Sequence, residues 1–120
     1  ELSLLFDFPG GNWGGAYIEM LEAKDLSEYT HLNFSLQFPS TLATAEIKLE
    51  SPSTNAFIYL ADYTGNQTSE GFIEYSIPLS DFAGLDMSSL TIPFAIWNPQ
   101  DIQGEFVTAK VLIDKLYYSK

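Results

Sequence analysis

Residues 30–38 read THLNFSLQF, and this stretch decides the fold class. Its apolar side chains stand at every second position with polar side chains between them: Leu32, Phe34, Leu36 and Phe38 alternate with His31, Asn33, Ser35 and Gln37. Successive side chains on a strand point to opposite faces, so this alternation predicts a strand with one buried face and one exposed face. Half-buried strands of this kind are typical of antiparallel sheets.

Similar patterns recur on both sides of this stretch. Residues 45–51 (AEIKLES) place Ile47 and Leu49 inside and charged residues outside. Further strand-like runs, separated by turn-forming Pro, Gly, Ser and Asn clusters, are LSLLFDF, GAYIEMLEA, AFIYLADY, FIEYSIPL, TIPFAIWN and AKVLIDKLYY. The only helical segments we expect are single turns at residues 25–29 and 86–90. About eight short strands predict an all-β fold, a two-sheet antiparallel β-sandwich of the jelly-roll type.

Length and composition limit the classes of function. A chain of 120 residues is expected to form one domain, here a single module over residues 1–120 that begins at Glu1 and was cut from a larger secreted protein. Sixteen Asp and Glu face five Lys and no Arg, which gives a net charge of -11. Nucleic acids and anionic membranes bind mainly through Lys and Arg, so we expect neither as a partner. The acidity is compatible with a salty, extracellular, marine setting.

The chain offers little catalytic chemistry. It has no Cys and a single histidine, His31, and it lacks a nucleophile elbow or a phosphate-binding loop before a helix. Glu19 and Glu74 could be nominated as the carboxylate pair of a glycosidase, but with sixteen acids such a pair arises by chance. We therefore expect no enzyme and no catalytic residue.

Aromatic residues at outward positions are the unusual feature of the sequence. In residues 93–101 (PFAIWNPQD), Phe94 and Ile96 share the face expected in the core, which sends Trp97 to the wet side before Asn-Pro ends the strand. Phe57 and Tyr59 alternate in the same way with aliphatic residues. Two alternatives stay open: a loop covers Trp97 at the rim, or the phase is reversed and Trp97 belongs to the core.

Exposed rings of this kind are typical of carbohydrate recognition. A ring stacks on the apolar C–H face of a sugar while amides and acids bond the hydroxyl groups, and no basic residue is needed. The candidate ligand-binding residues are Trp97, Trp13, Tyr59, Phe57, Glu74 and Asn98. An adhesion or protein-interaction sandwich is the alternative, but protein interfaces more often add Arg and Met to their aromatics, and Arg is absent here.

Three segments carry a resemblance to a known class of proteins: KDLSEYTHLNFSLQF, YSIPLSDFAGLDMSSLTIPFAIWN and VLIDKLYY. They resemble the jelly-roll carbohydrate-binding modules of bacterial polysaccharide-degrading enzymes. The similarity is greatest to the C-terminal glucan-binding-like domains of marine exoglucanases, and looser to the family 11 and family 4 modules. It covers most of the chain from Asp25 onward. The resemblance implies a covalently linked catalytic domain in the parent protein.

The resemblance also implies a structural calcium ion. Where these modules close with Ile-Asp, the Asp often helps to hold calcium, which maps to Asp114, with Asp7 in the neighbouring first strand. Lys115 stands where many of these modules have Asn. Calcium takes six to eight oxygen ligands and would stabilise a domain without disulfides, although both acids could simply be solvated.

The ligand we expect is a neutral algal or plant polysaccharide. A β-1,3-glucan (laminarin) comes first and an agarose-like galactan second, because a -11 surface without Arg has few cations for sulfated or uronate chains. We expect the domain to be a monomer.

Overall fold

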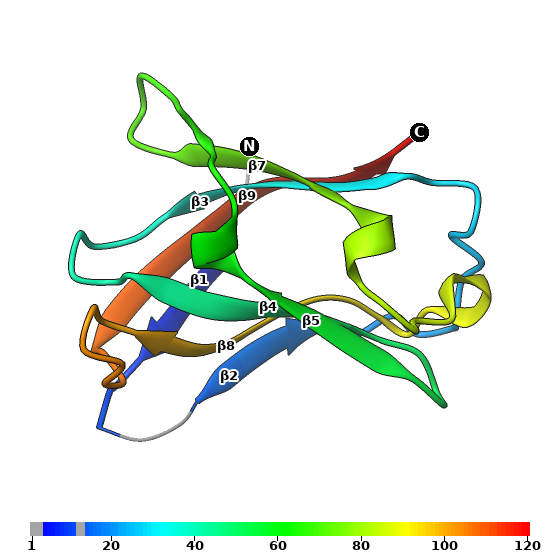
Figure 1. Cartoon of the computed structure of the whole chain (residues 1–120), viewed down its shortest axis with the longest axis horizontal. Coiled ribbons are helices and arrows are strands. Elements are labelled where there is room, and N and C mark those ends of the chain that lie inside the picture. Colours follow the sequence, from blue (N-terminus) through cyan, green and yellow to red (C-terminus); the bar gives the residue numbers. More distant parts are fainter. Residues whose placement is uncertain (1–3, 12–13) are drawn as a thin grey trace.

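The computed structural model describes residues 4–11 and 14–120 as two packed antiparallel sheets (Figure 1). The five-stranded sheet has the order β1-β9-β3-β7-β6, and the four-stranded sheet has the order β2-β8-β4-β5. The strands are β1 (Leu4–Phe8), β2 (Gly15–Ile18), β3 (His31–Gln37), β4 (Thr44–Glu50), β5 (Asn55–Tyr59), β6 (Asn66–Gln67), β7 (Ile73–Pro78), β8 (Ile92–Gln100) and β9 (Ala109–Ser119). Single 3-10 turns are η1 (Leu60–Asp62), η2 (Leu79–Asp81) and η3 (Met87–Ser89). None of the helices in the described residues could cross a membrane.

The strand order is that of a jelly roll. Strands β1 to β4 alternate between the two sheets, β5 folds back on β4 as a hairpin, and β7 to β9 alternate again. All strand pairs in the described part of the chain are antiparallel. The sequence prediction of an all-β, two-sheet sandwich is confirmed.

The core lies between the two sheets and is built on the stretch that opened the sequence. THLNFSLQF supplies β3, and its Leu32, Phe34 and Leu36 are buried. The Phe34 ring stacks on Tyr75 of β7, with 5.4 Å between ring centroids, and meets Phe94 of β8 edge-on at 5.2 Å. The contact with Phe94 joins the two sheets, so burial of alternating apolar residues fixes which face of each strand points inward.

Three local predictions need correction. Strand β8 does not end at Asn-Pro: Asn98 takes a left-handed φ of 53°, the register to β4 shifts there, and the strand continues to Gln100. A bulge therefore absorbs the Asn-Pro pair. GAYIEMLEA forms only the four-residue strand β2. Residues 25–29 form a turn instead of a helical turn.

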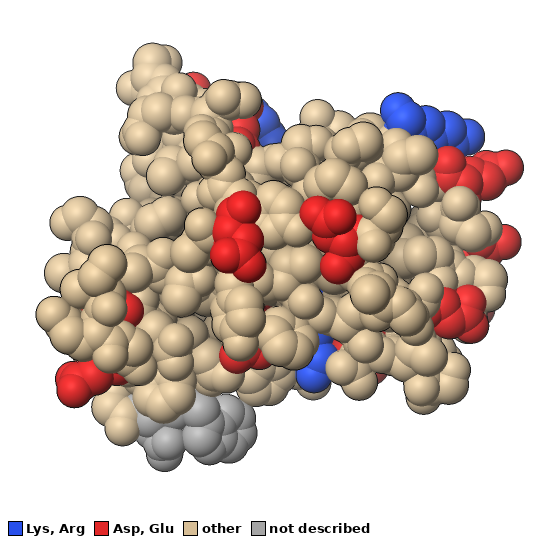
Figure 2. All heavy atoms as spheres, viewed as in Figure 1, with Lys and Arg blue, Asp and Glu red and all other residues tan. Residues whose placement is uncertain are grey.

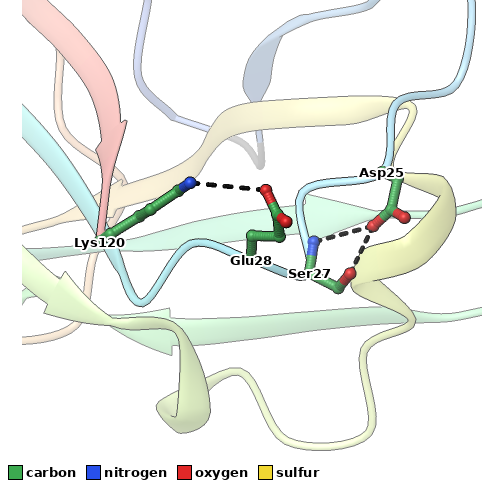
Figure 3. A network of polar contacts seen from close by, with 4 residues as sticks. All are labelled: Asp25, Ser27, Glu28 and Lys120. Atoms are coloured by element: carbon green, nitrogen blue, oxygen red, sulfur yellow. Dashed lines mark hydrogen bonds and ion pairs between the residues drawn. The ribbon is translucent and has the colours of Figure 1, made fainter.

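The turn at residues 25–29 leads into β3 and lies beside Lys120 at the C-terminal end of the chain (Figure 3). The hydroxyl and the backbone N–H of Ser27 donate hydrogen bonds to Asp25 Oδ1 at 2.5 and 3.0 Å, and these two bonds lower the pKa of the Asp25 carboxyl. Lys120 Nζ lies 3.5 Å from Glu28 Oε2 and 5.5 Å from the ring centroid of Tyr29. The ion pair is exposed and contributes little to stability, so the local hydrogen bonds define the turn.

Candidate functional site

The outer face of the four-stranded sheet gathers four aromatic side chains. Strand pairing sets two rows of residues across β2, β8, β4 and β5. We call the two rows the aromatic face: the first row is Gly15, Trp97, Glu46 and Tyr59, and the second is Tyr17, Ala95, Lys48 and Phe57. Adjacent strands lie about 4.8 Å apart, so each row is about 14 Å long.

Trp97 points away from the core, as the alternation predicted. Phe94 and Ile96 are fully buried in the core, whereas Trp97 is half-buried on the other side of β8. The ring lies close to Gly15, because a Cβ added there would clash with the six-membered ring of Trp97 at Cδ2, Cε3 and Cζ3. The ring therefore packs against the backbone at Gly15, and the absence of a side chain at this position lets the ring approach the sheet.

The other three rings face solvent. Phe57 and Tyr59 on the edge strand β5 are 44% and 46% exposed, and their rings pack edge to face at 5.4 Å and 87°. Tyr17 on β2, at the opposite end of the second row, is 54% exposed. Exposed aromatic surface concentrated on one sheet face is typical of a binding surface.

Polar groups are fixed beside the rings. Asn98 Nδ2 donates to Glu46 Oε2 at 3.0 Å, and Asn98 Oδ1 accepts from the Gly14 N–H at 3.3 Å. Lys48 Nζ lies 3.7 Å from Glu50 Oε2. An amide group carries two donors and a carboxylate about four acceptor sites, so these groups keep capacity for ligand hydroxyls after making their protein contacts.

The charges near this face favour an uncharged ligand. Figure 2 shows acidic side chains outnumbering lysines over the face in view, in line with the net charge of -11. Lys48 is the one cation among the eight residues of the aromatic face, and Glu50 lies within ion-pair distance of it. A polyanion needs several cationic partners, which these residues do not supply.

No protein-family model matches this chain. A search of curated proteins also found no match. Among solved structures, a similar one is a carbohydrate-binding module described as specific for non-crystalline cellulose, CBM28, with 14% sequence identity and a TM-score of 0.45 over 98% of this chain and 74% of that chain. This similarity is too distant to identify the function or the ligand.

The structure brings some of the predicted ligand residues together and separates others. Trp97, Tyr59, Phe57 and Asn98 lie on or beside the aromatic face. Glu74 lies on β7, on the outer face of the five-stranded sheet. The two outer faces of a sandwich point in opposite directions, so Glu74 does not belong to the aromatic face. The prediction for Trp13 lies outside the described residues.

The same separation affects the nominated glycosidase pair. Glu19 follows β2 of the four-stranded sheet, whereas Glu74 belongs to the five-stranded sheet. These two carboxyl groups therefore do not flank one cleft.

Sequence reasoning missed Tyr17, Glu46 and Lys48 as members of the site. Tyr17 alternates with the less exposed Ala16 and Ile18, so the period of two carried a signal for it. Nothing in the sequence, however, told which strands would be neighbours. Only the pairing of β2 and β4 on either side of β8 brings the three residues to Trp97.

The two predicted calcium ligands do not come together. Asp7 pairs with Lys110, four residues along β9 from Asp114, which at about 3.3 Å per residue is roughly 13 Å. Asp114 instead accepts the N–H of Lys115 at 2.8 Å and lines a small cavity of about 30 Å³ with Ser35, Thr68 and Glu70. One ion bound by both Asp7 and Asp114 does not fit this geometry, and among the described residues no group of three or more His, Cys, Asp or Glu is placed to hold a metal.

Proposed function

We propose that this chain is a non-catalytic carbohydrate-binding module that holds a neutral polysaccharide on its aromatic face. One observation carries the proposal: Tyr17, Trp97, Tyr59 and Phe57 lie on one sheet face beside Asn98 and the Glu46 carboxylate. Rings that stack on sugar C–H faces, with fixed acceptors and donors for hydroxyls around them, suit an uncharged polyol chain.

The layout supports an extended ligand. The rings are distributed over a surface about 14 Å long, across four strands, so consecutive sugar rings can stack on different side chains. Trp97 supplies a central ring held in place by its contact with Gly15. A rigid aromatic residue loses little conformational entropy on binding, which favours affinity.

The finer parts of the proposal come from composition and from the sequence resemblance. We place β-1,3-glucan first and an agarose-like galactan second, and we propose a secreted, monomeric module linked to a catalytic domain of a polysaccharide-degrading enzyme. Its role would be to keep that enzyme on its substrate, since linkage raises the effective concentration of the two partners.

Affinity gel electrophoresis tests this proposal. The domain should be retarded by laminarin or agarose and less by a sulfated galactan, and it should release no reducing sugar from either neutral chain. Tyr59→Ala should weaken retardation, because Tyr59 is an exposed ring of the aromatic face. Ile102→Ala is the matched control, since Ile102 is an exposed apolar residue in the loop after β8 and is not one of the eight residues of the aromatic face.

Each arm has an outcome that counts against the proposal. Release of reducing sugar by the pure domain would contradict the non-catalytic assignment. Retardation by the sulfated chain alone would contradict the assignment of a neutral ligand. Equal retardation of Tyr59→Ala and Ile102→Ala would contradict the assignment of the aromatic face as the binding surface.

A further inference from the structure

A depression lies on the side of the sandwich opposite the aromatic face, on the outer face of the five-stranded sheet. It has a volume of about 290 Å³, and we call it the polar groove. The residues used below are Asn33, Asn66, Glu74, Ser76, Lys115 and Tyr117. Pairing places Tyr117, Asn33 and Ser76 in one row across β9, β3 and β7, and Glu74 beside Asn66 of β6 in the next.

A β-bulge shapes one wall of the groove. The register between β3 and β9 shifts between Asn33 and Ser35, and Lys115 takes a left-handed φ of 52°. A left-handed backbone costs a residue other than Gly about 1 kcal/mol. Bulges of this kind redirect side chains and are frequent next to functional sites. Here the bulged strand contributes Lys115 and Tyr117 to the groove.

The floor of the groove is held rigidly. Asn33 is 9% exposed, its Oδ1 accepts from Ser76 Oγ at 2.7 Å, and its Nδ2 donates to Ser119 Oγ at 2.9 Å and to the Tyr117 carbonyl at 3.3 Å. A buried amide with partners on both ends keeps one orientation. The strands that carry Tyr117 and Ser76 are therefore locked to each other through one side chain.

The groove combines one exposed ring with polar groups of several kinds. Tyr117 is 56% exposed, Glu74 offers acceptors, Lys115 offers donors and Asn66 offers both. The mixed charge of Glu74 and Lys115 favours hydroxyl groups over a strongly charged ligand. The volume lies at the lower end of the range for small-ligand pockets and fits a segment of one or two sugar rings.

We propose that the polar groove is a second saccharide site, which binds a short segment or an end of a neutral glycan chain by stacking on Tyr117. It shares the ligand class of the aromatic face but none of its residues. The two sites lie on opposite outer faces of a molecule whose shortest dimension is 25 Å. Occupation of both sites would therefore join two separate chains or two distant segments of one chain.

Titration of the ¹⁵N-labelled domain with laminarihexaose, and separately with neoagarohexaose, tests the second site. We expect NMR shifts at the side-chain amides of Asn33 and Asn66 and at the Tyr117 backbone amide, saturating with their own dissociation constant. Tyr117→Ala should weaken this binding about tenfold, since a stacking ring is lost. Tyr117→Phe keeps the ring and should bind as the parent protein does.

The aromatic face serves as an internal control in the same spectra. Tyr117→Ala should leave the shifts near Trp97 unchanged, and Trp97→Ala should leave the shifts at the groove unchanged. Shifts at the groove without shifts near Trp97 would support the second site and contradict the first. If neither hexasaccharide shifts the groove signals at millimolar concentration, the inference is overturned, whatever happens near Trp97.

Stability of the variants is controlled separately. If Tyr117→Ala lowers the melting temperature enough to obscure binding, Glu74→Ala replaces it, because Glu74 is exposed and its truncation should not disturb the fold. Glu74→Ala should weaken binding at the groove several-fold. An unchanged dissociation constant in Glu74→Ala would also contradict the second site.

Discussion

Trp97 and Phe94 occupy the same strand but opposite faces, and the difference decides what each residue does. Phe94 is fully buried and packs edge-on against Phe34, whereas Trp97 lies across Gly15 on the outer face. The first contributes mainly to folding. We propose that the second contributes mainly to binding.

Alanine substitution of the two residues should separate these roles. Phe94→Ala should cost about 3 to 5 kcal/mol of unfolding free energy, because it leaves a cavity in the core. Trp97→Ala should cost only about 1 kcal/mol, since the ring is half-buried, while glycan affinity falls by about 1 to 3 kcal/mol. Urea unfolding and calorimetric titration measure the two quantities. A Trp97→Ala variant that unfolds but binds normally when folded would contradict this assignment.

Tyr63 couples stability to alkaline pH. Burial and the 2.6 Å hydrogen bond that its hydroxyl donates to Asp81 Oδ2 raise the pKa of Tyr63 to about 12. An unfolded tyrosine ionises near pH 10, so between pH 10 and about 12 the folded state holds more protons than the unfolded state. The contribution of Tyr63 is therefore complete below pH 10 and is lost as the pH rises to about 12.

Tyr63→Phe should reveal this contribution. The variant should lose about 1 kcal/mol at pH 8 through the missing hydrogen bond, and the gap to the parent protein should narrow by pH 11.5. Urea midpoints at the two pH values measure it. If the urea midpoints of the two proteins change with pH in parallel, the pKa of Tyr63 does not differ between the folded and the unfolded state.

At the scale of single elements, β8 shows how a local irregularity shapes the candidate site. Asn98 takes a left-handed backbone, and its side-chain amide makes hydrogen bonds with Glu46 of β4 and with Gly14 before β2, which ties both neighbouring strands to β8 beside Trp97. Asparagine tolerates this conformation better than most residues. The Asn-Pro pair thus marks a bulge, and the strand continues beyond it.

Substitutions at Asn98 should distinguish the backbone role from the side-chain role. Asn98→Gly keeps the left-handed backbone and removes the two side-chain bonds, and Asn98→Ala also adds about 1 kcal/mol of backbone strain. We expect both variants to lose glycan affinity and only Asn98→Ala to show the extra loss of stability. Thermal melts and affinity gels on both variants provide the measurement. Equal stability of the two variants would argue against strain at this position.

At the scale of the whole molecule, the prediction of calcium remains open to experiment. The register separates Asp7 from Asp114 and places Asp114 near Glu70. If calcium binds at Asp114, it stabilises the folded state by RT ln(1 + [L]/Kd), about 2.7 kcal/mol at a hundredfold excess. Chelation should then lower the melting temperature by several degrees.

The variants separate the two possible geometries. Asp114→Ala should lower the melting temperature and abolish the response to chelator, whereas Asp7→Ala should keep that response. A response lost in both variants would restore the Asp7–Asp114 pair. If chelator leaves the melting temperature of the parent protein unchanged, the prediction of a structural calcium ion is wrong.

The acidic surface should make stability depend on salt. Sixteen acids face five lysines, and the described residues contain two ion pairs, Lys48–Glu50 and Lys120–Glu28. The remaining acids repel one another, and about 0.1 M salt screens charges beyond about 10 Å. The urea midpoint should therefore rise between 10 and 300 mM sodium chloride. A falling midpoint would mean that attractive pairs dominate.

The sequence by itself determined the fold class and predicted the phase of the strands, while the reversed phase at Trp97 was excluded only by the burial of Phe94 and Ile96. Alternation separates buried from exposed residues in the β5 segment, because burying one face of a strand requires a period of two. In the β3 and β8 segments it separates core-facing from outward-facing residues. That is why Trp97, Phe57 and Tyr59 could be assigned to outer faces before any contact was known.

The outward-facing Asn33, Ser35 and Ala95 are buried as well, so the predicted exposed face of THLNFSLQF needs correction. Lys115 stands where many of the modules that the sequence resembles have Asn. The backbone at Lys115 is left-handed, a conformation in which Asn is enriched.

Only the tertiary structure decided which outer face each residue belongs to and which residues are neighbours there. Periodicity describes one strand at a time, whereas pairing between β2, β8, β4 and β5 depends on long-range contacts and on the bulges that shift register. The pairing places Tyr17 on the same face as Trp97 and Glu74 on the opposite sheet. It also places Asp7 four residues along the ladder from Asp114. A strand's hydrophobic pattern carries no information about its partner, so these assignments required the packed sandwich.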